Sequence, residues 1–266
     1  MSDNWESGDP YEKYVGRWSR RIAPEFLAWL SNPPGQRWLD VGCGTGALCA
    51  AIAEHCAPAS VSGIDPSEGF LKTARTRHGG RVAFQQGSAT DIAFAASSFD
   101  VTVCGLVLNF VADARAGLSE MARVTRPGGT LAAYVWDYSG KMELMRVFWD
   151  AAVELDPAAA KLDEGLRFPL CHPEALDTLF QSAGLTRVTT TAIDIATPFA
   201  SFDDYWSPFL GGNGPAPAYA MSLDEPTRVR LRECIRERLP IRADGSVQLT
   251  ARAWAVRGVV ANNSDA

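Results

Sequence analysis

The stretch Arg37–His55, RWLDVGCGTGALCAAIAEH, constrains the fold of this chain more than any other segment. A short apolar run ends at Gly42, three glycines alternate with other residues, and an alanine-rich run begins at Ala47. The two apolar runs have the lengths and compositions of a buried strand and a helix, and glycine permits the tight backbone turn between them. The pattern therefore predicts a strand, a glycine loop and a helix in direct succession.

The same alternation continues along the chain. Further strands are predicted at 60–65, 82–89, 130–137, 186–196 and 246–260, with one more inside 99–111, and helices at 11–30, 67–78, 114–125, 141–156 and 172–185. Strands that alternate with helices are typical of a doubly wound, mainly parallel sheet, and the strand inside 99–111 is nearly all apolar, as burial on both faces requires.

This reading predicts one α/β domain with elaborations. Residues 1–35 form an N-terminal helical cap, 36–197 and 246–260 form the core, and 198–245 form a helical and aromatic insertion before the last strand. A chain of 266 residues does not require a second domain.

Composition narrows the class of partner. A formal net charge of −6 disfavours nucleic acid, because proteins that bind it usually carry a basic surface, so a small molecule is the expected substrate. The six cysteines show no CxxC pair and predict a reduced, cytoplasmic protein. No secretory signal and no apolar run of about 18 residues is found, so we expect no membrane partner. We predict no metal site, and the chain could act as a monomer or a homodimer.

The glycine loop allows two interpretations. Gly42, Gly44 and Ala47 fit the dinucleotide fingerprint, whereas Gly42, Gly44 and Gly46 fit a GxGxG loop. In both, Asp65 ends the second strand, about twenty residues further on, where it can bind a ribose diol. Both interpretations therefore predict an adenosine-containing ligand. Taken alone, however, an Asp at this position is more often the cap of the following helix.

Asp40 favours one interpretation. It lies inside the apolar strand two residues before Gly42, where a carboxylate is costly to bury without a donor or a cation. A pyrophosphate would repel this carboxylate, whereas an ammonium group would suit it.

Four motifs in the same order resemble those of class I S-adenosylmethionine (SAM)-dependent methyltransferases, in the group similar to ubiquinone and menaquinone biosynthesis enzymes. The motifs are LDVGCGTG (39–46), GIDPSEGFL (63–71), the segment 87–111 and ARVTRPGGTL (122–131). The resemblance covers about 36–137 and implies a Rossmann-like, mainly parallel seven-stranded sheet with an antiparallel strand. It also implies SAM as cofactor and methyl transfer to a small, apolar or aromatic molecule, with O-methylation slightly favoured over N- or C-methylation.

The resemblance also implies a set of cofactor-binding residues. By this resemblance, the glycine loop lies under the methionine part of SAM, Asp40 holds the ammonium group and Asp65 binds the ribose. The adenine is flanked by Pro66, Ser67, Ser88 and Ala89, and the methionine side by Gly105 and Leu106. One position departs from the family: Ser88 stands where a carboxylate is common. Either Ser88 with neighbouring backbone meets the adenine amine, or Asp91 reaches it, or the affinity for adenine is weaker.

No residue is an evident general base. Positioning of donor and acceptor is the main requirement of such a reaction, so a base is needed only where the acceptor holds its proton tightly. Four candidates are named by position: Asn109 after the fourth strand, Asp137 and Tyr138 after the fifth, and His172 before a predicted helix.

Aromatic residues outside the motifs could line an acceptor pocket under a lid hinged at Gly211–Gly212, or could form a small core of their own. They are Phe148, Trp149, Phe168, Phe202, Tyr205, Trp206, Phe209 and Tyr219. Tyr14 and Trp18 in the predicted N-terminal helix could contact the methionine end of the cofactor, or could pack against the sheet. The arginines of 228–238 alternate with glutamates and apolar positions, which favours a solvated helix face over a nucleic-acid site.

Two other functions compete with methyl transfer. A nicotinamide dehydrogenase shares the glycine pattern but is disfavoured by Asp40 and by the later motifs. A non-catalytic protein that keeps the fold and binds SAM or another adenosine ligand fits the absence of an evident base equally well.

Overall fold

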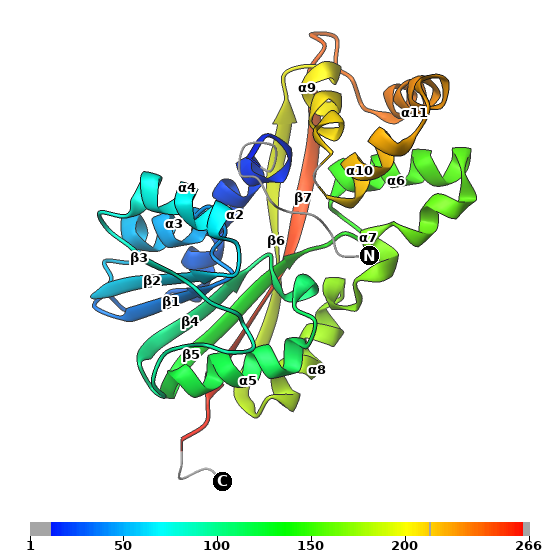
Figure 1. The fold of residues 1–266 in the computed structure, drawn as a ribbon. Coiled ribbons are helices and arrows are strands. Elements are labelled where there is room, and N and C mark those ends of the chain that lie inside the picture. The colour runs from blue at the N-terminus through cyan, green and yellow to red at the C-terminus, as the bar shows by residue number, and fades with distance from the viewer. Residues whose placement is uncertain (1–11, 213, 263–266) are drawn as a thin grey trace. The chain divides into compact units, whose positions relative to one another are not determined.

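The computed structural model describes residues 12–212 and 214–262 (Figure 1). Residues 1–11 of the predicted cap lie outside that range. The strands are β1 (Arg37–Val41), β2 (Ser60–Asp65), β3 (Ala83–Gln86), β4 (Phe99–Gly105), β5 (Thr125–Trp136), β6 (Leu185–Phe199) and β7 (Val247–Val260). The α-helices are α2 (Arg17–Leu30), α3 (Ala47–His55), α4 (Glu68–His78), α5 (Ala114–Val124), α6 (Glu143–Leu155), α7 (Glu164–Arg167), α8 (Pro173–Ser182), α9 (Phe202–Trp206), α10 (Pro215–Ser222) and α11 (Glu225–Arg238). Short helical turns are η1 (Glu12–Gly16), η2 (Leu108–Phe110), η3 (Pro157–Lys161), η4 (Pro169–Cys171) and η5 (Ser207–Gly211).

The strands form one seven-stranded sheet in the order β3-β2-β1-β4-β5-β7-β6. The pairs β2 with β3, β1 with β2, β1 with β4 and β4 with β5 are parallel, within a mixed sheet that is mostly parallel. The order reverses direction between β1 and β4, which is the place where open α/β sheets bind ligands. The predicted doubly wound, Rossmann-like fold is confirmed.

The chain divides into two compact units. One combines the described residues up to Trp18 with Trp136–Pro169 and Asp194–Arg252; the other combines Ser19–Val135, Leu170–Ile193 and the residues from Ala253. The predicted boundaries at 35, 197 and 246 differ from the limits of these units, and within the first unit α6 packs with α10 and α11. We call the first the aromatic unit and the second the sheet unit.

The faces of the sheet unit follow the two-residue period of its strands. In β1, Leu39 and Val41 belong to the core cluster that also contains residues of α5 and α8. Asp40 points to the opposite face, where its carboxylate meets Cys49 of α3. Figure 1 shows α5 and α8 together on one face, and α3 and α4 on the other.

The fifth strand begins earlier than the sequence predicts. Helix α5 ends at Val124 and β5 starts at Thr125, which pairs with Phe99, whereas the next pairing joins Thr130 to Val101. The intervening residues bulge from the ladder, with Gly128 at a φ of 72°. Pro127 cannot donate to a ladder, so the Pro-Gly-Gly sequence produces a bulge inside the strand rather than a stop before it.

Candidate functional site

The glycine loop leaves β1 through a tight turn. The N–H groups of Gly42 and Cys43 both donate to the carbonyl of Ile64, at 2.8 and 2.9 Å, which fastens the loop to the end of β2. Gly42, Gly44 and Gly46 have φ angles of 76°, 53° and 88°. These left-handed conformations explain why glycine occupies all three positions.

The three glycines differ in what surrounds them. A Cβ built on Gly42 would lie 2.6 Å from the Val107 side chain, and one on Gly46 would lie 2.9 Å from the ring of His78. A Cβ on Gly44 would have no described atom within 4 Å. Gly42 and Gly46 are therefore closed in by the protein's own packing, whereas the backbone at Gly44 is open to a ligand.

Asp65 connects the end of β2 to this loop. One carboxylate oxygen accepts a bond from the N–H of Gly44 at 2.9 Å, and the other accepts one from the N–H of Ser67 at 2.8 Å. Burial raises the pKa of Asp65 above its ordinary value, although both backbone bonds act in the opposite direction. Ser67, not Asp65, is the cap of α4, since its side chain accepts the N–H of Phe70. Each carboxylate oxygen can still accept a second hydrogen bond.

Asp40 is 1% exposed, as the sequence position suggests. One carboxylate oxygen accepts the thiol of Cys49 at 3.1 Å, and no donor within the described residues reaches the other, Oδ1. Burial raises the pKa of Asp40 to about 7, with the Cys49 hydrogen bond opposing the shift. A buried carboxylate oxygen without a donor favours the approach of a cation.

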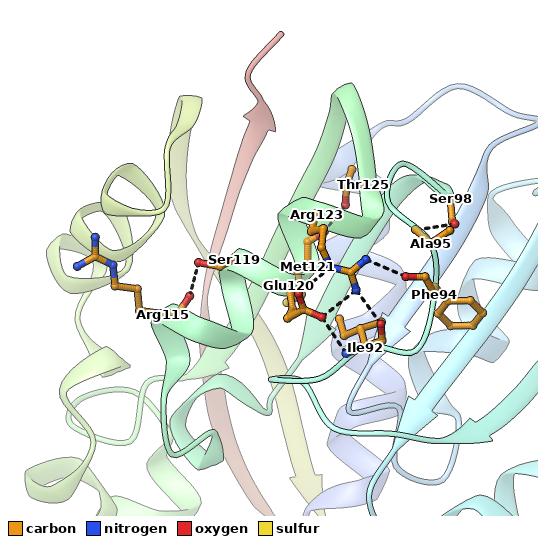
Figure 2. Close-up of polar contacts among 10 residues, drawn as sticks. All are labelled: Ile92, Phe94, Ala95, Ser98, Arg115, Ser119, Glu120, Met121, Arg123 and Thr125. Atoms are coloured by element: carbon orange, nitrogen blue, oxygen red, sulfur yellow. Dashed lines mark hydrogen bonds and ion pairs between the residues drawn. The ribbon is translucent and has the colours of Figure 1, made fainter. Parts of the chain in front are cut away.

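The segment beyond β3 is held by side chains of α5 (Figure 2). Arg123 donates to the carbonyls of Ile92 and Phe94 at 2.7 and 2.8 Å, while Glu120 pairs with Arg123 and accepts the N–H of Ile92 at 3.0 Å. The Arg123 guanidinium is the main cause that lowers the pKa of Glu120 to about 2. This network fixes the chain that follows Ser88 and Ala89.

The residues predicted to meet adenine lie at the ends of β2 and β3. The carbonyl of Pro66 accepts a bond from the Gln86 side chain at 2.9 Å, which ties the two strand ends together. The Ser88 hydroxyl lies 3.0 Å from that of Thr90. Ser88 is exposed, so its hydroxyl is accessible from solvent at this edge.

Beyond β4 the backbone is strained. Leu106 has a φ of 64°, which is unusual for a residue with a branched side chain, and its N–H donates to the carbonyl of Tyr134 at 2.7 Å. A Cβ at Gly105 would lie 2.8 Å from the Tyr134 hydroxyl. Strained backbone of this kind is common at functional sites.

The four catalytic candidates are placed very differently. Asp137 accepts Ser139 Oγ–H at 3.1 Å and Lys141 N–H at 3.0 Å, so both its oxygens stabilise its own turn. Tyr138 is buried against Phe168, with ring centroids 5.8 Å apart, and the His172 side chain is exposed at the start of α8. Asn109, in η2, has a buried Oδ1 that no described residue donates to.

The predicted pocket aromatics pack on one another in the aromatic unit. The Phe148 and Phe209 rings stack with centroids 4.5 Å apart, and Trp149 lies 5.7 Å from Tyr219. Tyr14 also belongs to this core, with its ring 5.3 Å from Phe209 and its hydroxyl 2.7 Å from the sulfur of Met145. These contacts favour the core interpretation over an open pocket, because such rings gain most by excluding water together. The lid and its hinge stay predictions.

Trp18 has the same kind of environment. It is 1% exposed, its ring lies 5.3 Å from that of Phe199, and the Arg17 guanidinium stacks on both rings. Little surface of Tyr14 or Trp18 is exposed, because both pack within the aromatic unit. Their contact with the methionine end stays a prediction.

Two supporting residues of the site were not predicted from the sequence. Cys49 supplies the thiol that Asp40 accepts, and Val107 packs against the Gly42 backbone. Gly63, in the middle of β2, was a signal for close packing, since its Cβ would lie 2.9 Å from Cys49 Sγ and 3.0 Å from Cys43 Sγ. Within residues 12–212 and 214–262, no group of three His, Cys, Asp or Glu side chains is arranged to hold a metal ion. In the same part of the chain, no helix combines the length and apolarity needed to span a bilayer.

Comparisons with known proteins agree with this geometry. Residues 39–133 match the methyltransferase domain family. A demethylmenaquinone methyltransferase of Symbiobacterium thermophilum is 38% identical over 121 residues, which make up 43% of this chain and 48% of that protein. An O-methyltransferase of Penicillium expansum is 31% identical over 178 residues, or 65% of this chain and 60% of that protein. The match thus spans about half to three fifths of these relatives' own lengths.

The solved structures share the fold. A phosphoethanolamine N-methyltransferase of Haemonchus contortus, bound to phosphomonomethylethanolamine and S-adenosylhomocysteine, superposes with a TM-score of 0.59 at 16% identity, covering 95% of this chain and 57% of that one. The four motifs quoted from the sequence all fall on the matched segment, 39–133. Residues 39–133 of this chain therefore match the methyltransferase domain family, and over 43% of its length the chain is similar to a demethylmenaquinone methyltransferase.

Proposed function

We propose that this protein uses SAM to methylate a small organic molecule. The observation that carries the proposal is the buried Asp40 carboxylate, whose Oδ1 has no donor within the described residues, just before a glycine loop that is open at Gly44. A methionine zwitterion brings the cation that this oxygen lacks, whereas a diphosphate would add like charge beside it.

The described residues fit the cofactor part by part. Asp40 would bind the ammonium group directly or through water, and the open backbone at Gly44 would lie against the methionine part. Asp65 would accept bonds from the ribose hydroxyls on its remaining lone pairs. Pro66, Ser67, Ser88 and Ala89 would flank the adenine, and Gly105 and Leu106 the methionine side. When bound, SAM supplies an electrophilic methyl group on a sulfonium sulfur.

The chain's own part in the reaction is positioning. Its glycine loop and β4 end would hold the donor, exclude water and align an acceptor with the methyl carbon at about 3 Å. The names of the relatives support a small-molecule acceptor, since one is a demethylmenaquinone methyltransferase and another an O-methyltransferase. We propose an apolar or aromatic acceptor, with oxygen as the favoured atom.

Calorimetry tests the binding half of this proposal. We expect the full chain to bind S-adenosylhomocysteine and SAM but not NADH. Asp65→Ala should weaken S-adenosylhomocysteine binding by about 100-fold, because two charge-assisted hydrogen bonds of ~1.5 kcal/mol each are lost. Glu54→Ala, which removes an exposed carboxylate from α3, should bind like the parent chain. Equal affinities for both variants would contradict the site.

Transfer of a labelled methyl group tests the catalytic half. The chain, labelled SAM and a small-molecule extract should yield a labelled product that depends on intact Asp65. Tight S-adenosylhomocysteine binding with no labelled product would favour a non-catalytic binding protein instead. Binding of NADH in its place would favour a dehydrogenase.

A further inference from the structure

Asn109 has an amide that the described residues satisfy only in part. Its Nδ2 lies 3.6 Å from Cys171 Sγ, which is a weak acceptor, and its Oδ1 is buried with no donor among the described residues. A buried amide oxygen without a hydrogen bond costs ~1–3 kcal/mol, a cost that a donor on a bound molecule would offset.

The position of Asn109 connects it with the glycine loop. It lies in η2, two residues after Val107, and Val107 is the residue whose side chain packs against the backbone of Gly42. The strained Leu106 fixes the start of the same turn through its bond to Tyr134. The turn therefore belongs to the carboxyl end of β4, beside β1, where the sheet order reverses.

The donor groups of the cofactor already have partners in the proposed site. Its ammonium group would bind to Asp40, and its ribose hydroxyls would donate to Asp65. Its adenine amine would donate to the segment around Ser88. The amide oxygen of Asn109 is left for the second reactant. We propose that Asn109 binds the methyl acceptor by accepting a hydrogen bond from its hydroxyl or amine, so that the acceptor class is a proton-bearing oxygen or nitrogen compound rather than a carbon nucleophile. This inference rests on the proposed methyl transfer.

The chemistry of an amide fits this role. The new bond joins the acceptor oxygen or nitrogen to the methyl carbon, the bond from carbon to the sulfonium sulfur breaks, and its electron pair stays on sulfur. The acceptor's proton leaves to bulk water, because an amide oxygen is too weak a base to keep it. Asn109 acts by turning the acceptor's lone pair toward the methyl group, and it remains neutral throughout.

Three variants test the inference. Asn109→Leu removes the hydrogen bond with little change of volume, and Asn109→Asp keeps an acceptor oxygen that can also take a proton. Asn32→Leu is the matched control: Asn32 also has a buried Oδ1 with no donor among the described residues, but it lies in the connection before β1, at the opposite end of that strand from the glycine loop.

We expect Asn109→Leu to bind S-adenosylhomocysteine within twofold of the parent while kcat/KM for transfer falls about 10- to 100-fold, the effect of losing one substrate hydrogen bond. Asn32→Leu should transfer normally. Asn109→Asp should retain transfer and gain a rise in kcat with pH that the parent lacks. Full transfer by Asn109→Leu, or an equal loss of cofactor affinity, would overturn the inference.

Two further readouts separate this inference from the proposed function. Hot hydriodic acid should release the label from the product as methyl iodide, as it does from O- and N-methyl groups; a label that stays on carbon overturns the acceptor class alone. A parent chain that binds S-adenosylhomocysteine but labels nothing overturns the methyl transfer.

Independently of turnover, Asn109→Leu should raise Tm by about 2–4 °C, because it removes a buried oxygen that no described residue donates to. A fall in Tm shows a structural partner and refutes the role.

Discussion

At the scale of single residues, Asp40 makes the function of the loop dependent on pH. Burial raises its pKa to about 7, and the nearby Asp65 carboxylate adds to the shift. The folded chain therefore holds a proton that the unfolded chain has already lost above pH ~4. This group's contribution to stability is present below pH ~4 and is lost as the pH rises through 7.

Replacing Asp40 separates the pH dependence that this residue causes from the pH dependence caused by other carboxylates. Asp40→Asn should remove the loss of stability between pH 5 and pH 8, as measured by Tm at the two values. In the parent chain, S-adenosylhomocysteine should bind more tightly at pH 8 than at pH 6, with release of about half a proton at pH 7, because an ammonium group favours the ionised carboxylate. The variant should bind weakly at both pH values. An unchanged pH profile in the variant would show that another group titrates.

The glycines give a second prediction at this scale. Gly44→Ala adds a methyl group where the structure leaves open space, so stability should fall only by the left-handed backbone cost of about 1 kcal/mol. The same methyl group would occupy the ligand's place, and S-adenosylhomocysteine binding should be lost. Gly35→Ala is the control, since it shares a positive φ and an open Cβ position but precedes β1. Normal binding by Gly44→Ala would exclude close approach of a ligand to this backbone.

At the scale of elements, the Arg123 and Glu120 side chains of α5 brace the segment after β3 (Figure 2). Glu120 has a pKa lowered to about 2, so its stabilising contribution is present above pH ~4.5 and is lost as the pH falls toward 2. The Glu120 side chain is 24% exposed and that of Arg123 is 38% exposed, so solvent screening limits the ion pair itself to about 0.5–1 kcal/mol.

Arg123→Met should therefore loosen the segment more than it destabilises the fold. We expect faster amide exchange at residues 90–98 and a several-fold weaker affinity for S-adenosylhomocysteine, because the adenine side of the proposed site loses its support. Arg115→Met, an exposed change on the same helix, provides the comparison. Equal rates of amide exchange in the two variants would mean that residues 90–98 keep their conformation without the Arg123 hydrogen bonds.

At the scale of the whole molecule, the aromatic unit has a core of its own. Phe209 contacts Tyr14, Phe148, Tyr205 and Trp206 at centroid distances of 4.5 to 6.0 Å. Phe209→Ala should cost about 3–5 kcal/mol of the free energy of unfolding, measured with denaturant, because truncating a buried ring leaves a cavity. Leu210→Ala, at a side chain 43% exposed, should cost little.

Phe209→Ala and Leu210→Ala also test whether the residues proposed to bind the cofactor all belong to the sheet unit. Asp40, Gly44 and Asp65 all lie in that unit. Below the temperature at which Phe209→Ala begins to unfold, we expect it to bind S-adenosylhomocysteine with the parent's affinity. A loss of affinity in the folded variant would show that residues of the aromatic unit contribute to binding.

Local spacing predicted the features that depend on neighbours in the chain. The strand, glycine loop and helix of 37–55, the burial of Asp40 and the seven strands followed from periodicity, because two- and 3.6-residue repeats record which face is buried. Contacts between segments that are distant in the sequence produce no such repeat, so they could not be predicted in this way. Three such features depend on how helices and turns pack onto the strand ends: Cys49 beside Asp40, Val107 against Gly42, and the Asn109 Oδ1 that no described residue donates to. The tertiary structure also decided that Asp137 serves its own turn and that the aromatic side chains meet each other, because a residue's type states what it can contact, whereas only packing determines what it does contact.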